Sequence, residues 1–163
     1  VSDSGASAGY PVWSPIGNKL AFHQRESGGK SRIWVKNFAD NTTEMIGNPA
    51  EQADWQFPEW SPSGKQIAFH SNQNGSVQPG IFDLETALLR NGNRSHNGDA
   101  RYARGSPDGQ RVLYAVDGEG LFLWRPYGTD DAILVTDKGG DTSSPQHAWR
   151  PRTLHIIIPP TFP

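Results

Sequence analysis

One phrase recurs along the chain and constrains its fold more than any other feature. It is clearest at residues 57–71 (FPEWSPSGKQIAFHS), and it returns at 10–23 (YPVWSPIGNKLAFH) and 102–114 (YARGSPDGQRVLY). A degraded fourth copy occupies 146–156 (QHAWRPRTLHI). The equivalent positions 13, 60, 105 and 149 lie 44 to 47 residues apart. A fixed period of this length is typical of a repeat protein.

Each copy predicts a strand, a tight turn and a second strand. Proline at 62 and glycine at 64 suit the second and fourth positions of a type I turn. The apolar side chains of Ile67 and Phe69 then alternate with Ala68 and His70, which is the period-2 pattern of a strand. One period has room for four short strands, the size of a β-propeller blade. The 18 glycines and 13 prolines suit many tight turns and argue against a helical protein.

The phrase resembles the PxWSPDG repeat of the TolB-type, WD-like β-propellers, and the resemblance covers residues 10–158. This family includes TolB, oligogalacturonate lyases and the non-catalytic propellers of prolyl-oligopeptidase-like enzymes. The resemblance implies an all-β fold built from four-stranded antiparallel blades. Because one propeller fold supports many unrelated activities, the repeat itself does not define a function.

The repeat predicts a single propeller domain over 1–163, with about three and a half blades near 10–46, 56–90, 101–136 and 145–158, the last of them incomplete. Propellers of the TolB type close with six or seven blades, so the resemblance implies a partial propeller or a half-ring. Three interpretations follow: a piece of a longer chain, two copies that close one ring, or a small open propeller. The first interpretation is favoured.

Two segments of the second blade depart from the repeat. Gln78, Pro79 and Gly80 stand where an apolar strand should begin, which predicts a bulge or a shortened third strand. Residues 84–90 (LETALLR) have a helix-like composition, but the repeat register predicts a turn followed by the outer strand.

Composition excludes several classes of function. The 15 basic and 17 acidic residues nearly balance, so charge gives no argument for nucleic-acid binding. No apolar run approaches the roughly 18 residues of a membrane-spanning helix, and we expect no membrane insertion. The chain has no cysteine and therefore no disulfide framework or thiol chemistry.

The tryptophans fall into two groups. Trp13, Trp60 and Trp149 occupy equivalent positions in three copies of the phrase, and this repetition indicates packing between neighbouring blades. Trp55 lies outside the phrase, in a predicted connecting loop. It is therefore the better candidate for stacking on a ligand.

Three histidines offer a choice between metal binding and structural roles. His23 and His70 are equivalent, and we expect each to lie between blades with a hydrogen bond to backbone. A metal pair is the alternative, but the tight spacing of a metal motif is absent. His147, on the predicted innermost strand of the fourth copy, is a candidate binding residue. The lyases of this family hold a metal through histidines and a glutamine, but their ligands cannot be assigned to residues of this chain.

Acidic residues precede the innermost strands, and charged residues follow on those strands. Asp54, Asp99 and Asp141 lie in loops expected at one end of the central channel. They could bind a cation or the basic groups of a partner, or they could cap turns, as aspartate commonly does. Glu59 and Arg104 are expected to face the channel from neighbouring blades, where they could form an ion pair or line the channel and contact a ligand.

The sequence contains no coherent catalytic constellation. Gly105 and Gly109 flank a serine, but the serine begins a β-turn and lacks the strand-to-helix setting of a hydrolase elbow. We therefore interpret the protein as a non-catalytic scaffold that binds a protein or peptide through its channel-face loops, with no cofactor and no metal. A carbohydrate-active lyase and the propeller of a peptidase are the alternatives. Self-association that closes the ring is a third role.

The resemblance to TolB implies a bacterial protein with a periplasmic or secreted location, with a cytoplasmic location as the alternative. A protein partner is favoured over nucleic acid because the sequence shows no basic stripe and no base-stacking motif.

Overall fold

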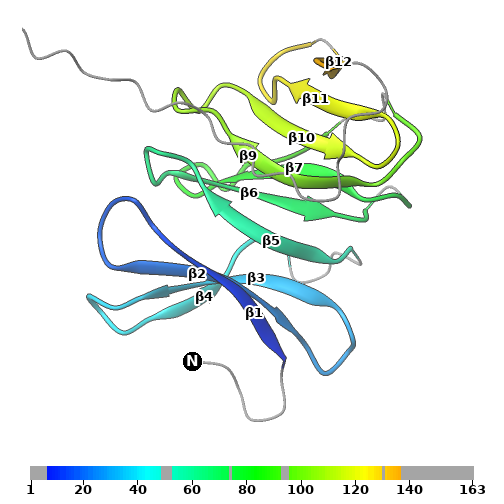
Figure 1. Cartoon of the computed structure of the whole chain (residues 1–163). Coiled ribbons are helices and arrows are strands. Elements are labelled where there is room, and N and C mark those ends of the chain that lie inside the picture. Colours follow the sequence, from blue (N-terminus) through cyan, green and yellow to red (C-terminus); the bar gives the residue numbers. More distant parts are fainter. Residues whose placement is uncertain (1–6, 49–52, 74, 93–95, 130, 137–163) are drawn as a thin grey trace, which may run out of the picture.

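The structure is a computed structural model that describes residues 7–48, 53–73, 75–92, 96–129 and 131–136. Within these residues, twelve strands form three four-stranded antiparallel sheets that lie face to face, one above the other (Figure 1). The predicted all-β fold of propeller blades is therefore confirmed as a partial propeller. The predicted fourth blade, near 145–158, lies outside the described residues.

The three sheets follow the repeat, with strand bounds that differ from the expected ones by a few residues. Blade 1 contains β1 (Ala8–Trp13), β2 (Lys19–Arg25), β3 (Ser31–Asn37) and β4 (Thr43–Met45). Blade 2 contains β5 (Trp55–Trp60), β6 (Gln66–Ser71), β7 (Gln78–Asp83) and β8 (Leu89–Asn91). Blade 3 contains β9 (Ala100–Gly105), β10 (Val112–Val116), β11 (Gly120–Trp124) and β12 (Ile133–Leu134).

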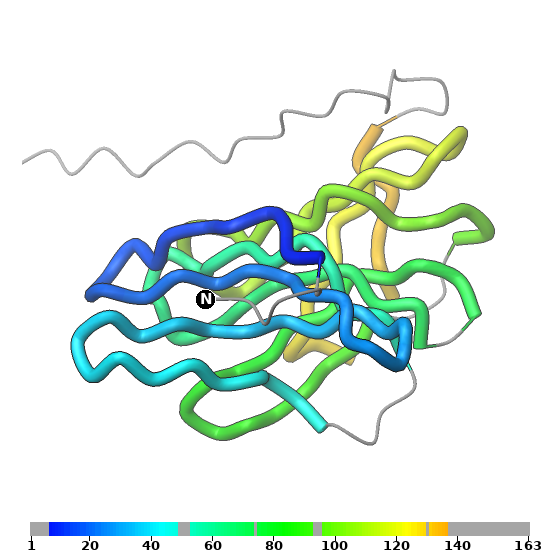
Figure 2. Tube along the Cα trace, turned by 90° about the horizontal axis from the view of Figure 1, so that it is seen from below, coloured from blue at the N-terminus to red at the C-terminus, as the bar shows by residue number. Residues whose placement is uncertain are grey.

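Every sheet keeps its strands in chain order, as Figure 2 shows for blade 1 from blue to cyan. The first strands of the three sheets are neighbours, because β1 contacts β5 and β5 contacts β9. These three strands form what we call the inner edge of the molecule, on the side where a propeller has its channel. The short fourth strands form the opposite, outer edge.

The turn of the repeated phrase forms as predicted. The Gly64 N–H donates to the Ser61 carbonyl at 2.9 Å, and the Gly109 N–H donates to the Ser106 carbonyl at 2.8 Å. Both glycines have a positive φ, +67° and +70°, which explains why the phrase keeps glycine here. The turn therefore helps to fix the register of the first two strands in blades 2 and 3.

The predicted interruption of the third strand in blade 2 is wrong. β7 spans six residues and pairs with β6 without any register shift. The Pro79 carbonyl accepts a hydrogen bond from Gly92 N–H at 2.7 Å, on the side of β8. Backbone N and O of one residue point to the same side of a strand, so the missing N–H of proline faces the end of β8 and leaves the β6 ladder intact.

The other local prediction for blade 2 is confirmed. Residues 84–86 form a turn, and the outer strand β8 follows at Leu89. The described part of the chain has no helix with the length and hydropathy needed to span a bilayer.

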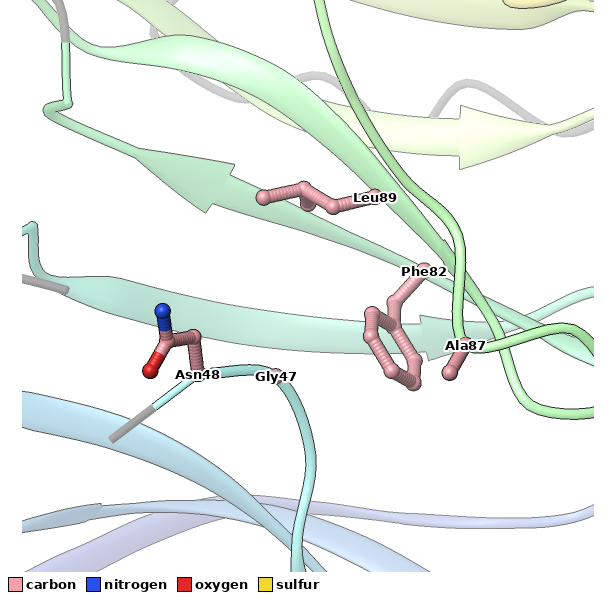
Figure 3. Close-up of a pocket in the computed structure, with 5 residues that line it drawn as sticks. All are labelled: Gly47, Asn48, Phe82, Ala87 and Leu89. Carbon is pink, nitrogen blue, oxygen red and sulfur yellow. The ribbon is translucent and has the colours of Figure 1, made fainter. Parts of the chain in front are cut away.

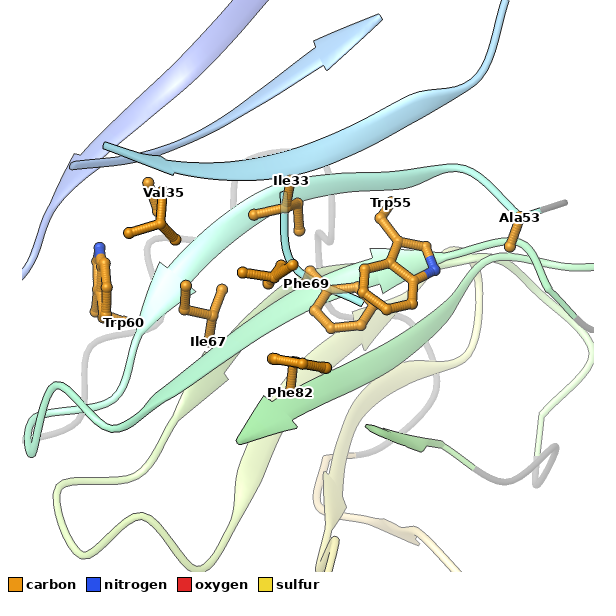
Figure 4. Close-up of a cluster of buried hydrophobic side chains, with 10 residues drawn as sticks. Ile33, Val35, Ala53, Trp55, Trp60, Ile67, Phe69 and Phe82 are labelled. Carbon is orange, nitrogen blue, oxygen red and sulfur yellow. The ribbon is translucent and has the colours of Figure 1, made fainter. Parts of the chain in front are cut away.

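Two apolar clusters hold the three blades together. The first lies between blades 1 and 2 and is shown in Figure 4. It contains Ile33 and Val35 from β3, and Trp60, Ile67 and Phe69 from blade 2, all nearly inaccessible to solvent. The second cluster joins Ala68 and Ile81 of blade 2 to Val112, Tyr114 and Phe122 of blade 3. Each blade is thus stabilised by its neighbours, as expected in a repeat protein.

Candidate functional site

The tryptophan of the phrase packs between blades where a preceding blade is present. Trp60 is 6% exposed, and its Nε1–H donates to the Val12 carbonyl of β1 at 3.1 Å. The equivalent Trp13 is 63% exposed, because no described sheet covers the face of blade 1 that points away from blade 2. The packing prediction is confirmed for Trp60 and wrong for Trp13, while Trp149 lies outside the described residues.

The prediction that Trp55 is a ligand-stacking residue in a loop is wrong. Trp55 begins β5, is 2% exposed, and stacks on Phe69 with ring centroids 4.4 Å apart. A Cβ at Gly47 would lie 2.3 Å from the indole ring, so the glycine makes room for it. Because the strand starts one residue earlier than expected, the side chain belongs to the core and offers no face to a ligand.

Two of the loop acids link neighbouring blades. Asp54 accepts the backbone N–H of Ser31 at 2.8 Å and the side-chain amide of Asn72 at 2.9 Å. Asp99 accepts the backbone N–H of Val77 at 2.9 Å. In both cases the loop before one blade is tied to the start of the third strand of the preceding blade. From the sequence we had expected either turn capping or the binding of a cation or of a partner's basic groups, so this link between blades was not predicted. Asp141 lies outside the described residues.

The repeated histidines accept hydrogen bonds from the backbone of the next blade, as predicted. His23 Nδ1 accepts the Phe57 N–H at 3.3 Å, and His70 Nε2 accepts the Ala103 N–H at 3.1 Å. Burial, aided by the positive charge of Arg101, lowers the pKa of His70 to about 4. Burial also lowers the pKa of His23. Both imidazoles are thus held neutral, the form in which a ring nitrogen can accept.

Glu59 and Arg104 come together at the inner edge. Glu59 lies on β5 and Arg104 on β9, and the two form an ion pair between blades, which is one of the two alternatives that the sequence left open. Their side chains are 29% and 44% exposed, so the pair is accessible. Arg101, also on β9, pairs with Asp117 at 2.9 Å. The charged side chains of β5 and β9 are therefore all paired with a side chain of opposite charge.

Aromatic side chains at the inner edge were missed by the sequence reasoning. Tyr10, Phe57 and Tyr102 are equivalent residues, and each lies where the pairing of the first strand with the second shifts register. All three have a positive φ, between 51° and 57°. The signal was available, because the three intact copies of the phrase all begin with an aromatic residue.

A small apolar pocket of about 240 Å³ lies at the outer side of blades 1 and 2 (Figure 3). Its lining residues are Gly47, Asn48, Phe82, Ala87 and Leu89. No residue that the sequence nominated contributes to it.

Metal binding has no geometric support in the described ranges. These ranges contain no group of three or more His, Cys, Asp or Glu side chains arranged to hold a metal ion. His147, the remaining candidate from the sequence, lies outside them.

Comparison with solved structures identifies propellers. TolB from Acinetobacter baumannii is 24% identical, with a TM-score of 0.63, over 82% of this chain and 33% of that one. Pyrococcus horikoshii acylaminoacyl peptidase is 18% identical, with a TM-score of 0.60, over 83% of this chain and 25% of that one. An oligogalacturonate lyase in complex with manganese is 16% identical, with a TM-score of 0.55, over 75% and 36%.

The chain thus spans about a quarter to about a third of the length of these structures. No protein-family model and no curated protein sequence matches it. At these identities the similarity shows the fold and does not carry over an activity. The chain is therefore a partial β-propeller, structurally similar to TolB and to the propellers of enzymes.

Proposed function

We propose that the protein is a non-catalytic binding scaffold that engages a protein or peptide partner through its inner edge. The observation that carries the proposal is the exposed Glu59–Arg104 ion pair, which joins two blades at that edge. Its two opposite charges are fixed in space and accessible, which suits recognition of a partner with complementary charges. A periplasmic or secreted location is part of the proposal and rests on the similarity to TolB.

The links between blades support this role by making the inner edge rigid. The carboxylate of Asp54, the imidazoles of His23 and His70, and the indole of Trp60 all bond to the backbone of a neighbouring blade. A surface that is ordered before binding loses less conformational entropy when a partner arrives. The inner edge is therefore better prepared for binding than the turns between the strands.

A charge exchange tests the proposal. Peptides would be selected on the wild-type protein from a displayed random library and then measured against the double variant Glu59→Arg/Arg104→Glu. The exchange keeps the ion pair between blades but reverses the charges that a partner meets. We expect the selected peptides to bind the exchanged protein at least tenfold more weakly, measured by surface plasmon resonance.

The matched control is Lys65→Glu/Glu85→Lys, which exchanges an exposed ion pair within blade 2, 2.9 Å apart, away from the inner edge. The control should bind like wild type. Equal binding by all three proteins, or an equal loss in both variants, would contradict recognition at the inner edge.

An enzymatic role is the second proposal, supported by the similarity to a manganese-bound lyase and to a peptidase. If the chain is a metal-dependent lyase, it should cleave polygalacturonate, and both a chelator and His147→Ala should abolish cleavage. Product formation would be followed by the absorbance of the unsaturated ends. Cleavage that needs both the metal and His147 would replace the scaffold proposal. The peptidase version would instead require a catalytic domain on the parent protein.

A further inference from the structure

We propose that Asn97 is a site of spontaneous modification, where the Asn97–Gly98 pair deamidates with the Glu119 carboxylate as its base. The proposal is independent of the scaffold function. In an Asn–Gly pair the amide nitrogen of the glycine can attack the side-chain carbonyl carbon of the asparagine, because glycine has no Cβ to hinder the approach. Asn97 is exposed, and the pair lies in the loop that leads from blade 2 to β9 of blade 3.

The reaction needs only water as a co-reactant. The Gly98 nitrogen gives up its proton and forms a bond to Cγ of Asn97. The Cγ–Nδ2 bond breaks, and the amide group takes up the proton and leaves as ammonia. Water then opens the five-membered imide at one of its two carbonyls, which gives aspartate or isoaspartate. Either product carries one negative charge more than asparagine, and in isoaspartate the main chain runs through the former side chain.

Glu119 is placed to remove the proton that the attack releases. Its Oε1 accepts the Gly98 N–H at 3.0 Å and the Asn97 N–H at 2.8 Å. A general base must lie within hydrogen-bond reach of the proton that it abstracts, and Oε1 meets this condition at the reacting nitrogen. Glu119 lies in the hairpin between β10 and β11, so the base belongs to the folded blade rather than to the reacting loop.

Packing explains why the chain has a glycine at position 98. A Cβ at Gly98 would lie 2.8 Å from Cγ1 of Val116 and 3.0 Å from the carbonyl oxygen of Asp117. A larger residue would therefore push the loop away from the β10–β11 hairpin. The close contact with blade 3 thus requires the same residue that makes Asn97 labile.

The other Asn–Gly pair that the structure describes in full lies in a more protected setting. Asn91 is the last residue of β8, where it pairs with Gly80, and the Gly92 N–H donates to the Pro79 carbonyl at 2.7 Å. A neutral carbonyl oxygen is a far weaker base than a carboxylate, and pairing in the sheet restrains the backbone. Asn91 should therefore deamidate more slowly than Asn97. The third pair is at 74–75, and its asparagine lies outside the described residues.

Deamidation of Asn97 would weaken the junction between blades 2 and 3. The new charge would arise in a residue whose backbone N–H binds the Glu119 carboxylate, and like charges repel. The same loop continues into Asp99, which accepts the Val77 N–H at 2.9 Å, and into Ala100, whose N–H donates to the Val77 carbonyl at 2.8 Å. The extra main-chain atom of isoaspartate would disturb both contacts. The protein should therefore lose stability as Asn97 reacts.

The test follows the three Asn–Gly pairs during storage of the protein for several weeks at neutral pH. Trypsin places each pair on a different peptide, because it cleaves after Lys65, Arg90, Arg94 and Arg101. Mass spectrometry of the digest measures the gain of one mass unit that accompanies deamidation. We expect the peptide with Asn97 to gain mass faster than the peptide with Asn91. We also expect Asn97 to react at least fivefold more slowly in Glu119→Gln than in the wild type, because glutamine keeps an oxygen for both N–H groups but is not a base.

Two further variants serve as controls. Glu85→Gln removes a carboxylate from a turn of blade 2, where it pairs with Lys65, and should leave the rate at Asn97 unchanged. Asn97→Gln removes the labile pair. Its midpoint of urea unfolding should stay constant during storage, whereas the midpoint of the wild type should fall.

Three results would overturn the proposal. The first is an Asn97 peptide that reacts no faster than the Asn91 peptide. The second is a rate at Asn97 that is equal or higher in Glu119→Gln, because the carboxylate would then not act as a base. The third is a wild-type urea midpoint that stays constant after Asn97 has reacted, because the loop would then not contribute to the junction.

Discussion

His70 makes one contact between two blades dependent on pH. Its Nε2 accepts the Ala103 N–H of blade 3, and only the neutral ring can do so. His70 lies on β6, which pairs with β5 and β7, and its ring lies beside the Phe57 ring; the charged group that acts on it is Arg101 of β9. Ala115 replaces this histidine in the third copy of the phrase, so a histidine hydrogen bond to the next blade is not present in every blade.

We expect the stability of the protein to fall as the pH drops from 6.5 towards 4. The pKa of His70 is about 4 in the folded state against 6.5 for an ordinary histidine, so the unfolded chain binds the proton first. The contribution is complete above pH 6.5 and is lost progressively down to the folded pKa. It amounts to at most about 3 kcal/mol at neutral pH. Urea unfolding between pH 7 and 4 would measure it.

His70→Gln is the control for this prediction, because glutamine offers an acceptor oxygen but does not titrate in this range. The variant should lose less stability between pH 6.5 and 4 than the wild type does. An identical pH dependence in the two proteins would show that His70 is not the responsible group.

Single residues also show what the sequence could predict. The equivalence of His23 and His70 correctly indicated backbone hydrogen bonds, because repeated positions meet repeated environments. Trp55 was misplaced, because a boundary error of one residue separates a loop from a buried strand end. The equivalence of Tyr10, Phe57 and Tyr102 could be read from the sequence, but their positive φ angles could not, because residue type does not reveal them.

At the level of elements, the loops before blades 2 and 3 are hydrogen-bonded to the preceding blade. Asp54 and Asp99, at equivalent positions, each accept a backbone N–H at the start of the third strand of that blade. The strands and turns were predictable because they follow local rules, namely alternation and the glycine of the turn. The hydrogen bonds of Asp54 and Asp99 were not predictable, because they join residues more than twenty positions apart. The continuity of β7 was not predictable either, because it depends on whether the missing N–H of Pro79 faces β6 or β8.

Asp54→Ala should destabilise the protein by about 1–2 kcal/mol. The change leaves the Ser31 N–H without its acceptor and removes the bond to Asn72, both in a half-buried setting. The midpoint of urea unfolding would measure the loss. Glu85→Ala removes an exposed ion pair with Lys65 and should shift that midpoint much less. Equal shifts in the two variants would contradict the inter-blade tie.

At the level of the whole molecule, the blade 1 face that is turned away from blade 2 leaves large aromatic side chains exposed. Trp13 and Phe38 lie there, 63% and 46% exposed, with ring centroids 5.4 Å apart. The same position in blade 2 holds the buried Trp60, which donates to the carbonyl of Val12. We propose that a second copy of the chain can cover this face, as in a ring closed by two halves.

Light scattering over a range of concentrations tests self-association. The wild type should approach twice the 17.9 kDa mass of the chain as concentration rises, and Trp13→Glu should remain a monomer. Tyr127→Glu introduces the same charge at another exposed aromatic residue and should behave as wild type. A monomeric wild type at every concentration would rule out closure by a second copy.

The central claim is that the inner edge, rather than the outer pocket, is where a partner binds. Titration of the ¹⁵N-labelled protein with the tightest library-selected peptide, followed by amide chemical shifts, tests it most directly. The account predicts that the largest shifts occur in β1, β5 and β9, around Tyr10, Glu59 and Arg104. Shifts concentrated at the pocket residues Gly47, Phe82 and Leu89, with the inner strands unchanged, would contradict it.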